Sequence, residues 1–347
     1  MGAATLVGNG AAYLLSMVAA RVLTPEEFGA MGALLGILVI ISTVGIATQA
    51  LTARRVAVAT PGQERTRAEG DAIRLSVLSA VVIALAGLLA AWPLGALFTI
   101  PPVAVACGIA SIGFVVIGSA AMGISQGREE HLRLSWGFVV NGVSRAVVGI
   151  VTVVLLDSVV GVGVGILIGT AIGAVISYRI SCPGAWSRSI AKGTGAEFGH
   201  TLHALIVLFT LTNVDVLLAR VFLTEQQSGE YSVGVLLGNV VIRILGGAQY
   251  THLGSEAWLF ALEGSAFALV QVLLYARLAS EDRRAVVTVW GGLAVLVAVV
   301  ALWRHSSVAS IVTTVVAVSL LLVIVGLVMD RRQMSAPAAE LPLEPAE

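Results

Sequence analysis

The sequence predicts an all-α polytopic membrane protein with about ten or eleven transmembrane helices. Apolar residues make up 58% of the 347 residues and charged residues only 12%, a composition that does not fit a soluble surface. Apolar runs long enough to cross a bilayer as a helix follow one another with little chain between them. They are rich in Leu, Ala, Val and Gly without alternating polarity. This pattern favours helices over a β-barrel, since a helix satisfies its own backbone hydrogen bonds in lipid.

The predicted spans occupy residues 3–22, 30–53, 75–98, 101–124, 134–156, 158–178, 202–222, 255–276, 285–303 and 307–329. No basic residue precedes the first span, so we expect no cleaved signal. Residues 231–250 are the exception. Their apolar core runs only from Val233 to Ile242 and is interrupted by Asn239 and followed by Arg243. This predicts a re-entrant or interfacial helix, with an eleventh span as the alternative.

The basic residues predict the orientation of these spans. With both termini in the cytoplasm, fifteen of the twenty Lys and Arg residues fall in cytoplasmic loops, as the positive-inside rule requires. Arg21, Arg220 and Arg304 fall on the opposite side, and Arg145 and Arg243 lie within apolar sequence. If residues 231–250 crossed the membrane, the count would become eleven inside against seven outside, so the first arrangement is favoured.

A repeat divides the chain into halves. "AARVLTPEEFGAMGALLGILVI" begins at residue 19, and "LARVFLTEQQSGEYSVGVLLGNVVI" begins at residue 218. In each copy a span ends in Ala-Arg, a Leu-Thr turn follows, and a glycine precedes an apolar helix. The helices "GALLGILVI" and "GVLLGNVVI" match at six of nine positions, and their small-xxx-small pairs, which favour close helix packing, are Gly32 with Gly36 and Gly234 with Gly238. Both copies lie on one side of the membrane, which predicts two parallel-repeat lobes.

Three stretches resemble the multidrug/oligosaccharidyl-lipid/polysaccharide (MOP) exporter superfamily, and within it the bacterial polysaccharide-biosynthesis flippases. They are "AARVLTPEEFGAMGALLG", "GISQG" followed by a basic loop, and "NVDVLLARVFLTEQQSGEYSVGVLLG". The resemblance implies two helical lobes around a central cavity, in the inner (plasma) membrane of a bacterium. Between "GVLLGNVV" and "IRILGGAQY" the chain looks as though most of a helix and a loop are missing, so we expect a shortened second lobe.

The expected organisation follows from the repeat and the charges. It consists of a six-helix N-terminal lobe at 1–182, a cytoplasmic linker at 183–201, a shortened C-terminal lobe at 202–333 and a disordered tail at 334–347 that is rich in Pro, Ala and Glu. The basic stretch at 54–74 is expected to be a solvated connector.

Arg145 is the candidate for substrate binding. It lies in "WGFVVNGVSRAVVGIVTVVLL", about 15 Å from either interface, where a guanidinium costs at least about 2.5 to 3.5 kcal/mol unless it faces a cavity or a partner. Its fork of N–H donors fits the oxygens of a pyrophosphate on a lipid-linked sugar. A structural ion pair with Asp215 or Glu263 is the alternative. Asn141, one turn away, and Arg243 complete the candidate lumen site.

Asp215 and Glu263 are candidates for ion coupling, because ionisable groups inside membranes are commonly functional. For Asp215 the alternative is an interfacial pair with Arg220, and for Glu263 it is a protonated, hydrogen-bonded packing residue. Arg21 and Arg220 occupy matching positions in the repeat and are the two residues predicted at the outer mouth, where Arg21 is expected to be a head-group anchor and not a gate.

Four glycines, Gly161, Gly165, Gly169 and Gly173, recur on one helical face of "VGVGVGILIGTAIGA" and predict a packing seam. They do not predict a nucleotide loop, since no strand precedes them and no phosphate-binding motif occurs. Two cysteines and isolated histidines give no metal-ligand set, and no catalytic motif appears, so we expect no cofactor, no metal and no enzymatic activity. A net charge of zero gives no nucleic-acid footprint.

The leading functional prediction is outward flipping of a lipid-linked saccharide by alternating access, with membrane lipid and this substrate as partners. Polysaccharide-assembly proteins are further candidate partners. One alternative is a shortened homologue that has lost transport and serves as a membrane scaffold in polysaccharide assembly. Another is a drug or cation exporter of the same superfamily, which would depend on Asp215 and Glu263 more than on Arg145.

Overall fold

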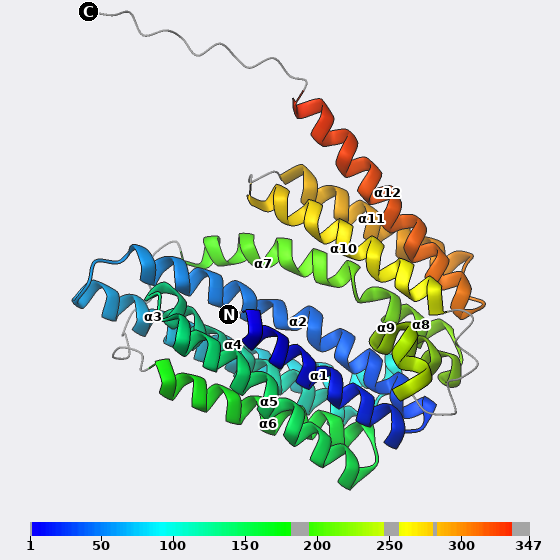
Figure 1. The fold of residues 1–347 in the computed structure, drawn as a ribbon, viewed down its shortest axis with the longest axis horizontal. Helices are drawn as coiled ribbons and strands as arrows, with labels where there is room; N and C mark the ends of the chain where they lie inside the picture. The colour runs from blue at the N-terminus through cyan, green and yellow to red at the C-terminus, as the bar shows by residue number, and fades with distance from the viewer. Residues whose placement is uncertain (1, 182–193, 246–256, 280–282, 335–347) are drawn as a thin grey trace, which may run out of the picture.

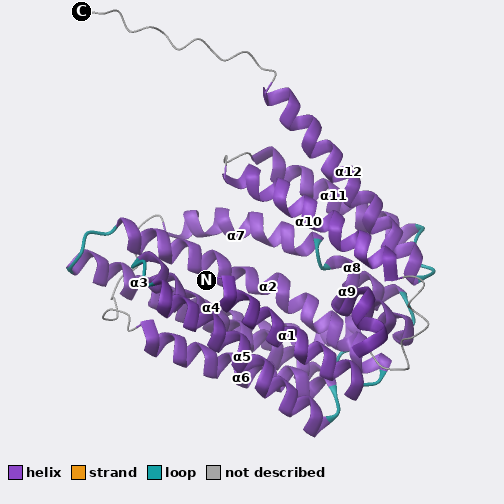
Figure 2. Ribbon diagram, in the orientation of Figure 1, coloured by secondary structure: helices purple, strands orange, loops and turns teal. Residues whose placement is uncertain are grey.

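The computed structural model describes residues 2–181, 194–245, 257–279 and 283–334, and every element in these ranges is an α-helix (Figures 1 and 2). The helices are α1 (Gly2–Val22), α2 (Pro25–Val58), α3 (Gln63–Phe98), α4 (Pro102–Gly127), α5 (His131–Leu156), α6 (Val159–Ser181), α7 (Thr194–Leu211), α8 (Val214–Phe222), α9 (Glu225–Leu245), α10 (Ala257–Ala279), α11 (Arg283–Leu302) and α12 (Val308–Met334).

The lengths and apolar composition of these helices confirm a multi-pass membrane protein. Among the described residues, α1–α6 and α12 make seven helices that are long and apolar enough to cross a bilayer, and α7 with α8 makes an eighth, bent one. Helices α10 and α11 have 23 and 20 residues, close to the roughly 20 that a span requires. Each predicted span therefore contains a helix or, at 202–222, a helix pair.

Two predicted connectors are largely helical. The stretch 54–74 belongs mostly to α2 and α3, which have 34 and 36 residues and are separated only by residues 59–62. The predicted linker 183–201 is helical from Thr194 onward. Arg, Glu and Ala have high helix propensity, so charge and polarity mark the end of the hydrocarbon core but do not end the helix.

The span at 202–222 is broken near its middle. Helix α7 stops at Leu211, α8 starts at Val214, and their axes are bent by 46°. The Asn213 side chain donates hydrogen bonds to the carbonyl oxygen of Phe209 (2.8 Å) and to Thr212 Oγ1 (3.1 Å). Such local side-chain bonds compete with the helical hydrogen-bond pattern, which gives the break a cause in the sequence.

The two repeat helices begin with the same cap. Thr24 Oγ1 accepts the amide of Glu27 at the start of α2, and Thr224 Oγ1 accepts the amide of Gln227 at the start of α9, both at 3.3 Å. These hydroxyls satisfy amides that a helix start leaves unpaired. As a result α9 begins at Glu225 and runs for 21 residues, longer than the apolar core that the sequence indicated.

The helices form two lobes. The first lobe, α1–α6, is built around α4, which packs against α2, α3, α5 and α6. The second lobe, α7–α12, meets the first through α7, α8 and α9, which contact α1, α2 and α3 (Figure 1). Within the described chain, α10, α11 and α12 pack only against one another and against α7–α9.

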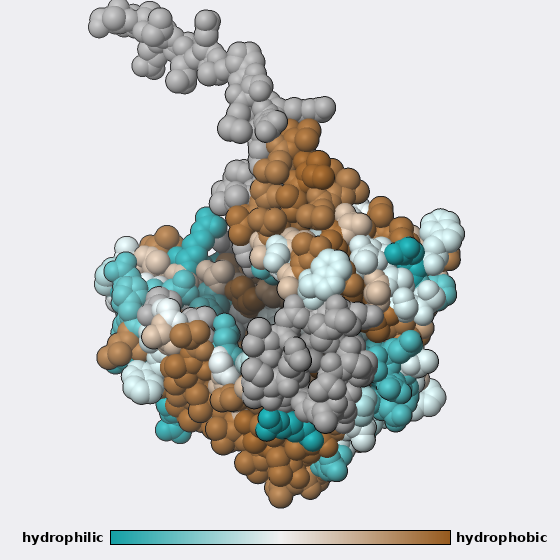
Figure 3. Space-filling model, turned by 45° about the vertical axis from the view of Figure 1, so that its right-hand side comes forward, coloured by the Kyte–Doolittle hydropathy of each residue, from teal (hydrophilic) through white to brown (hydrophobic). Residues whose placement is uncertain are grey.

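The outer surface suits a bilayer. Along α3, large apolar side chains are exposed in a continuous row, which consists of Leu78, Val81, Val82, Leu85, Leu88, Leu89 and Trp92. Figure 3 shows broad apolar surface over both lobes and a hollow between them on the face in view. A surface of this kind is stable only where lipid takes the place of water.

Candidate functional site

Arg145 faces open space inside the first lobe. It lines a cavity of about 430 Å³ enclosed by α1, α2, α4, α5 and α6, and a second cavity of about 220 Å³ nearer the start of α1. The residue is half-buried, with its backbone in the middle of α5. The guanidinium that the sequence placed deep in the membrane therefore borders two hollows in the first lobe.

The glycines of α6 bring its backbone close to α5 at this point. A Cβ built at Gly169 would lie 2.5 Å from the Cα of Arg145, and one built at Gly165 would lie 2.6 Å from the Cα of Gly149. Ser144 Oγ donates to the carbonyl oxygen of Gly169 at 2.8 Å, which links the two helices directly. Close approach of this kind requires residues without a side chain. The α6 glycines thus fix the position of Arg145.

The rest of the predicted α6 seam continues along the same interface. A Cβ at Gly161 would lie 2.6 Å from the carbonyl oxygen of Thr152, and one at Gly173 would lie 3.0 Å from the Cα of Asn141. The Asn141 side chain donates to Ser177 Oγ at 2.7 Å and to the carbonyl oxygen of Gly137 at 2.9 Å. Asn141 thus borders the smaller cavity while its amide is bonded within the α5–α6 interface.

Hydroxyl groups line the larger cavity together with Arg145. They come from four helices and belong to Tyr13, Ser16, Ser42, Ser111, Ser119 and Thr170. Several donate to a carbonyl of their own helix, for example Thr170 to Ile166 at 2.7 Å and Ser42 to Val39 at 2.7 Å. A hydroxyl that donates in this way still accepts hydrogen bonds. The hydroxyls of α2, α4 and α6 carried no signal in the sequence, because only packing brings these helices around one space.

The guanidinium of Arg145 has no hydrogen-bond acceptor or carboxylate partner among the described residues. In particular, the alternative ion pair with Asp215 or Glu263 is not formed, because both acids lie in the second lobe and contact Tyr231 instead. A membrane-buried cation without a protein counter-charge favours an anion in the adjacent space.

Asp215 and Glu263 form a buried cluster with Tyr231. Their exposed fractions are 0% and 4%, and the Tyr231 hydroxyl lies 3.0 Å from Asp215 Oδ2 and 3.2 Å from Glu263 Oε1. One hydroxyl proton cannot satisfy both carboxylates, and the other two oxygens, Asp215 Oδ1 and Glu263 Oε2, are buried without a hydrogen-bond partner among the described residues. The cluster therefore needs an additional proton or cation to be satisfied. Tyr231 carried no signal in the sequence that linked it to either acid.

Arg220 joins the two lobes, whereas Arg21 is exposed. The Nε and Nη2 atoms of Arg220 donate to the carbonyl oxygens of Phe98 (2.9 Å) and Thr99 (3.0 Å), at the end of α3. A third bond reaches the carbonyl oxygen of Glu26 at 3.4 Å. A cation at the carbonyl end of a helix is favourable both as a donor and through the helix dipole. These bonds hold the lobes together at the end where α1 meets α2, and the outer-mouth role of Arg21 and Arg220 stays a prediction.

The repeat glycines lie at the contact between the lobes. A Cβ at Gly29 would lie 2.8 Å from the amide nitrogen of Gly229, its own repeat mate, and a Cβ at Gly32 would clash with Ser232. Gly36 faces Leu217 of α8. Gly234 instead faces the ring of Phe260 within the second lobe. The predicted residues Gly238 and Arg243 lie outside the residues whose side chains are described.

These contacts give the structural register of the repeat. Positions 200 residues apart are structurally equivalent. Thr24 and Thr224 form the same cap, and Gly29 contacts Gly229. The nine-residue match that aligns Gly32 with Gly234 is displaced from this register by two residues. Two residues turn a helix by about 200°, so the matching glycines lie on different faces.

The sequence and the fold were compared with known proteins. Residues 1–248 match the family described as polysaccharide biosynthesis protein. No curated protein matches the chain.

The fold is similar to that of several solved transporters. An inward-facing multidrug resistance MATE family transporter of the MOP superfamily aligns with a TM-score of 0.70 and 14% identity, over 96% of this chain and 95% of that one. The lipid II flippase MurJ in an inward closed conformation aligns with a TM-score of 0.71 and 10% identity, over 94% and 86%. A MOP superfamily transporter from Pyrococcus furiosus aligns with a TM-score of 0.60 and 13% identity, over 96% and 94%.

Proposed function

The chain belongs to the polysaccharide biosynthesis protein family, and from this premise we propose that it flips a lipid-linked saccharide to the outer leaflet by alternating access. The two-lobed MOP-type fold supports a transport role. The choice of substrate rests on Arg145. Its guanidinium lies halfway along α5, lines two cavities and has no counter-charge among the described residues.

Arg145 is proposed to bind the phosphate or pyrophosphate that joins lipid to sugar. Such a group is anionic, and a guanidinium fork binds it with two parallel hydrogen bonds that are stronger at low dielectric. The surrounding hydroxyls offer acceptors to sugar hydroxyl groups. Only the polar head needs the cavity, since the polyprenyl tail remains in the bilayer between the lobes.

The Arg220 contacts are proposed to be the outer gate in its closed state. They join α8 of the second lobe to α3 of the first at the end predicted to be extracellular. The bonds of Arg220 to the first lobe all go to carbonyl oxygens, and its ion-pair partner Glu225, at 3.9 Å, belongs to the second lobe like Arg220 itself. The bonds between the lobes can therefore break and re-form without separating this ion pair. Release of the substrate to the outside requires these bonds to open.

The acid cluster in the second lobe is proposed to couple transport to a cation gradient. Asp215 and Glu263 share one tyrosine hydroxyl and retain two unsatisfied oxygens, so binding of a proton or a sodium ion changes their charge in a dry site. The same cluster supports a second candidate function, export of organic cations, for which these acids would bind the cargo itself.

A reconstituted flipping assay tests the proposal. The full-length protein is placed in vesicles containing a fluorescent polyprenyl-pyrophosphate disaccharide, and a membrane-impermeant quencher reports its transfer between leaflets. We expect Arg145→Ala to lower the initial rate about 100-fold, and Arg145→Lys about tenfold, because an ammonium lacks the fork. The matched control is Arg133→Ala, an exposed arginine on the same helix that pairs with Glu130.

The outcomes separate the two candidate functions. Wild-type flipping rates in Arg145→Ala exclude the phosphate role. If the same vesicles also move a fluorescent organic cation, and Asp215→Asn abolishes that movement while Arg145→Ala does not, the cation exporter is the correct function.

A further inference from the structure

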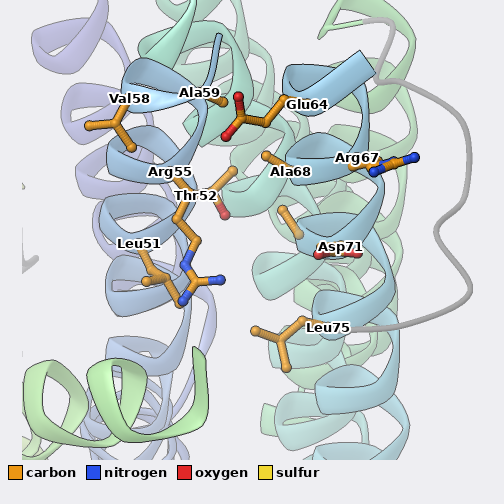
Figure 4. Close-up of a pocket in the computed structure, with 11 residues that line it drawn as sticks. Leu51, Thr52, Arg55, Val58, Ala59, Glu64, Arg67, Ala68, Asp71 and Leu75 are labelled. Atoms are coloured by element: carbon orange, nitrogen blue, oxygen red, sulfur yellow. The ribbon is translucent and has the colours of Figure 1, made fainter. Parts of the chain in front are cut away.

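A cavity of about 310 Å³ lies between α2 and α3, at the end of the molecule predicted to be cytoplasmic (Figure 4). It is separate from the Arg145 cavities, since no residue is shared between them. It exists because the two helices continue past the hydrocarbon core and are joined by only four residues, 59–62, that hold their ends together. Its walls combine charged and apolar residues.

The charges in this cavity are of both signs and sum to zero. Arg55 extends from α2 into the gap, and Asp71 stands on α3 across from it, while Arg67 points away from α2 at the rim (Figure 4). Glu64 lies near the top and accepts hydrogen bonds from Thr60. A space with one cation inside and carboxylates beside it does not favour a simple anion. It favours a molecule that carries separate positive and negative charges.

Asp71 places the strongest constraint on the chemistry of a ligand in this cavity. Its Oδ1 atom is buried and has no hydrogen-bond donor among the described residues. It forms no ion pair with Arg67, although the two are four residues apart on one helix, a spacing that allows such a pair. A buried carboxylate oxygen without a donor is costly, so the site favours a ligand that brings a hydrogen-bond donor, and a charged N–H group most strongly.

The cavity also has an apolar side that leads toward the bilayer. Leu51 and Leu75 form its lower wall, and the exposed apolar row of α3 begins with Leu78, less than one turn beyond Leu75. Behind it, Val56 and Ile73 are buried in a cluster with residues of α4. A ligand whose head occupies the cavity can therefore lay a hydrocarbon chain along α3.

The walls of the cavity are held in place by a buried ion pair. Arg128 of α4 donates to both carboxylate oxygens of Glu69 of α3, at 2.7 and 2.6 Å, and to the carbonyl oxygen of Ser181 at 3.1 Å. Glu69 lies between the cavity residues Ala68 and Asp71 in the sequence of α3, and its side chain is only 2% exposed. The bidentate geometry fixes the first turns of α3 against α4, so the cavity exists before a ligand binds.

We propose that this cavity binds the head group of an aminophospholipid from the adjacent leaflet, with its phosphate at Arg55 and its primary ammonium at Asp71. The acyl chains then follow the apolar row of α3. A phosphatidylglycerol head offers Asp71 only neutral hydroxyl donors, and a choline head offers no N–H donor, so neither supplies the charge-assisted hydrogen bond that an ammonium gives the buried oxygen. This inference does not depend on the proposed flipping activity, because it concerns a bound membrane lipid and not the cargo.

Native mass spectrometry of the full-length protein in detergent tests the site. The probes are short-chain phosphatidylethanolamine, phosphatidylcholine and phosphatidylglycerol, titrated separately. We expect the wild type to bind the ethanolamine lipid about tenfold more tightly than the other two, the effect of one charge-assisted hydrogen bond. Asp71→Asn should remove this preference, and Arg55→Gln should weaken binding of all three lipids.

Controls make each outcome decisive. Asp157→Asn, an exposed carboxylate at the far end of α5, should retain the wild-type preference. Equal affinity of the wild type for the three lipids overturns the proposal without reference to any variant, as does an unchanged preference in a folded Asp71→Asn protein. If free O-phosphoethanolamine binds as tightly as the intact lipid, the site is one for a soluble head group and the lipid assignment is wrong.

Discussion

The two lobes share one packing scheme and differ by one helix. In the first lobe α4 packs against α2 and α6, and α5 packs against α1 and α6. In the second lobe α10 packs in the same way against α9 and α12, and α11 against α12 and the broken pair α7–α8. Helix α3, which packs against α2 and α4, has no counterpart in the described part of the second lobe.

This difference shows which helices a lobe can lose. The missing position is the peripheral one, and α3 itself buries few residues and presents its apolar row to lipid. Removing such a helix exposes surface to the bilayer and not to water, so the remaining packing stays intact. The shortening of the second lobe near Asn239 stays a prediction from the sequence.

The lobes also differ in their buried charge. The first holds a cation, Arg145, beside two cavities, and the second holds two acids, Asp215 and Glu263, around one tyrosine. Opposite charges in two otherwise similar lobes are consistent with an anionic cargo in one and a coupling cation in the other. Three groups of substitutions test this comparison of the lobes.

The largest expected effect concerns the ion pair that holds α3, the helix unique to the first lobe. Glu69→Gln leaves Arg128 without its counter-charge and should lower the free energy of unfolding by about 3 kcal/mol. Hydrogen exchange in detergent should show lost protection in α3 and little change in α10–α12. Glu130→Gln, which removes a surface pair with Arg133 at 3.0 Å and a long contact with Arg128 at 4.0 Å, should cost less than about 1 kcal/mol. Equal effects of the two substitutions would show that α3 is not held by this pair.

A smaller effect is expected at the contact between the lobes. Gly229→Ala places a Cβ against the backbone of Pro25 and should destabilise the folded protein by about 2 kcal/mol through overpacking. Gly264→Ala on α10 is the matched control, since nothing lies within 4 Å of its Cβ position. Thermal unfolding monitored by fluorescence measures both. A wild-type midpoint for Gly229→Ala would mean that the lobes do not touch at the repeat glycines.

The smallest effect concerns the acid cluster. Asp215→Asn and Glu263→Gln should each reduce gradient-driven transport about tenfold, because each removes a charge-assisted contact to the coupling cation. Exchange without a gradient should persist. Tyr231→Phe leaves both acids in place and should give the weaker phenotype. If all three variants respond to proton and sodium gradients like the wild type, the cluster is structural only.

Much of the fold could be predicted from the sequence because a bilayer imposes a simple length rule on apolar helices. Each of the ten predicted spans holds a helix or a helix pair, and seven of these helices, or eight with the bent pair, meet that rule in the described residues. The Ala-Arg and Leu-Thr repeat marked the end of the first span of each lobe. The break at Thr212 and Asn213 could not be predicted, since the composition of 202–222 is that of an unbroken span.

The candidate site was predicted only in part. Arg145 stood out because a charge inside an apolar run is rare and costly. The hydroxyls at Ser111 and Thr170 gave no such signal, because small polar residues are common in membrane helices and only packing brings them to one cavity. The pairing of Asp215 with Tyr231 depends on how α8, α9 and α10 pack, which spacing along the chain does not encode.

The isolation of α10–α12 from the first lobe has a mechanical consequence. In the described chain every force between these helices and α1–α6 passes through α7, α8 and α9, and the 46° bend at Asn213 lies inside that link. We therefore expect α10–α12 to move relative to the first lobe as one body surrounded by lipid. Lateral pressure in the bilayer acts on its whole length, so membrane thickness and curvature stress should bias the angle between the lobes even when no cargo is bound.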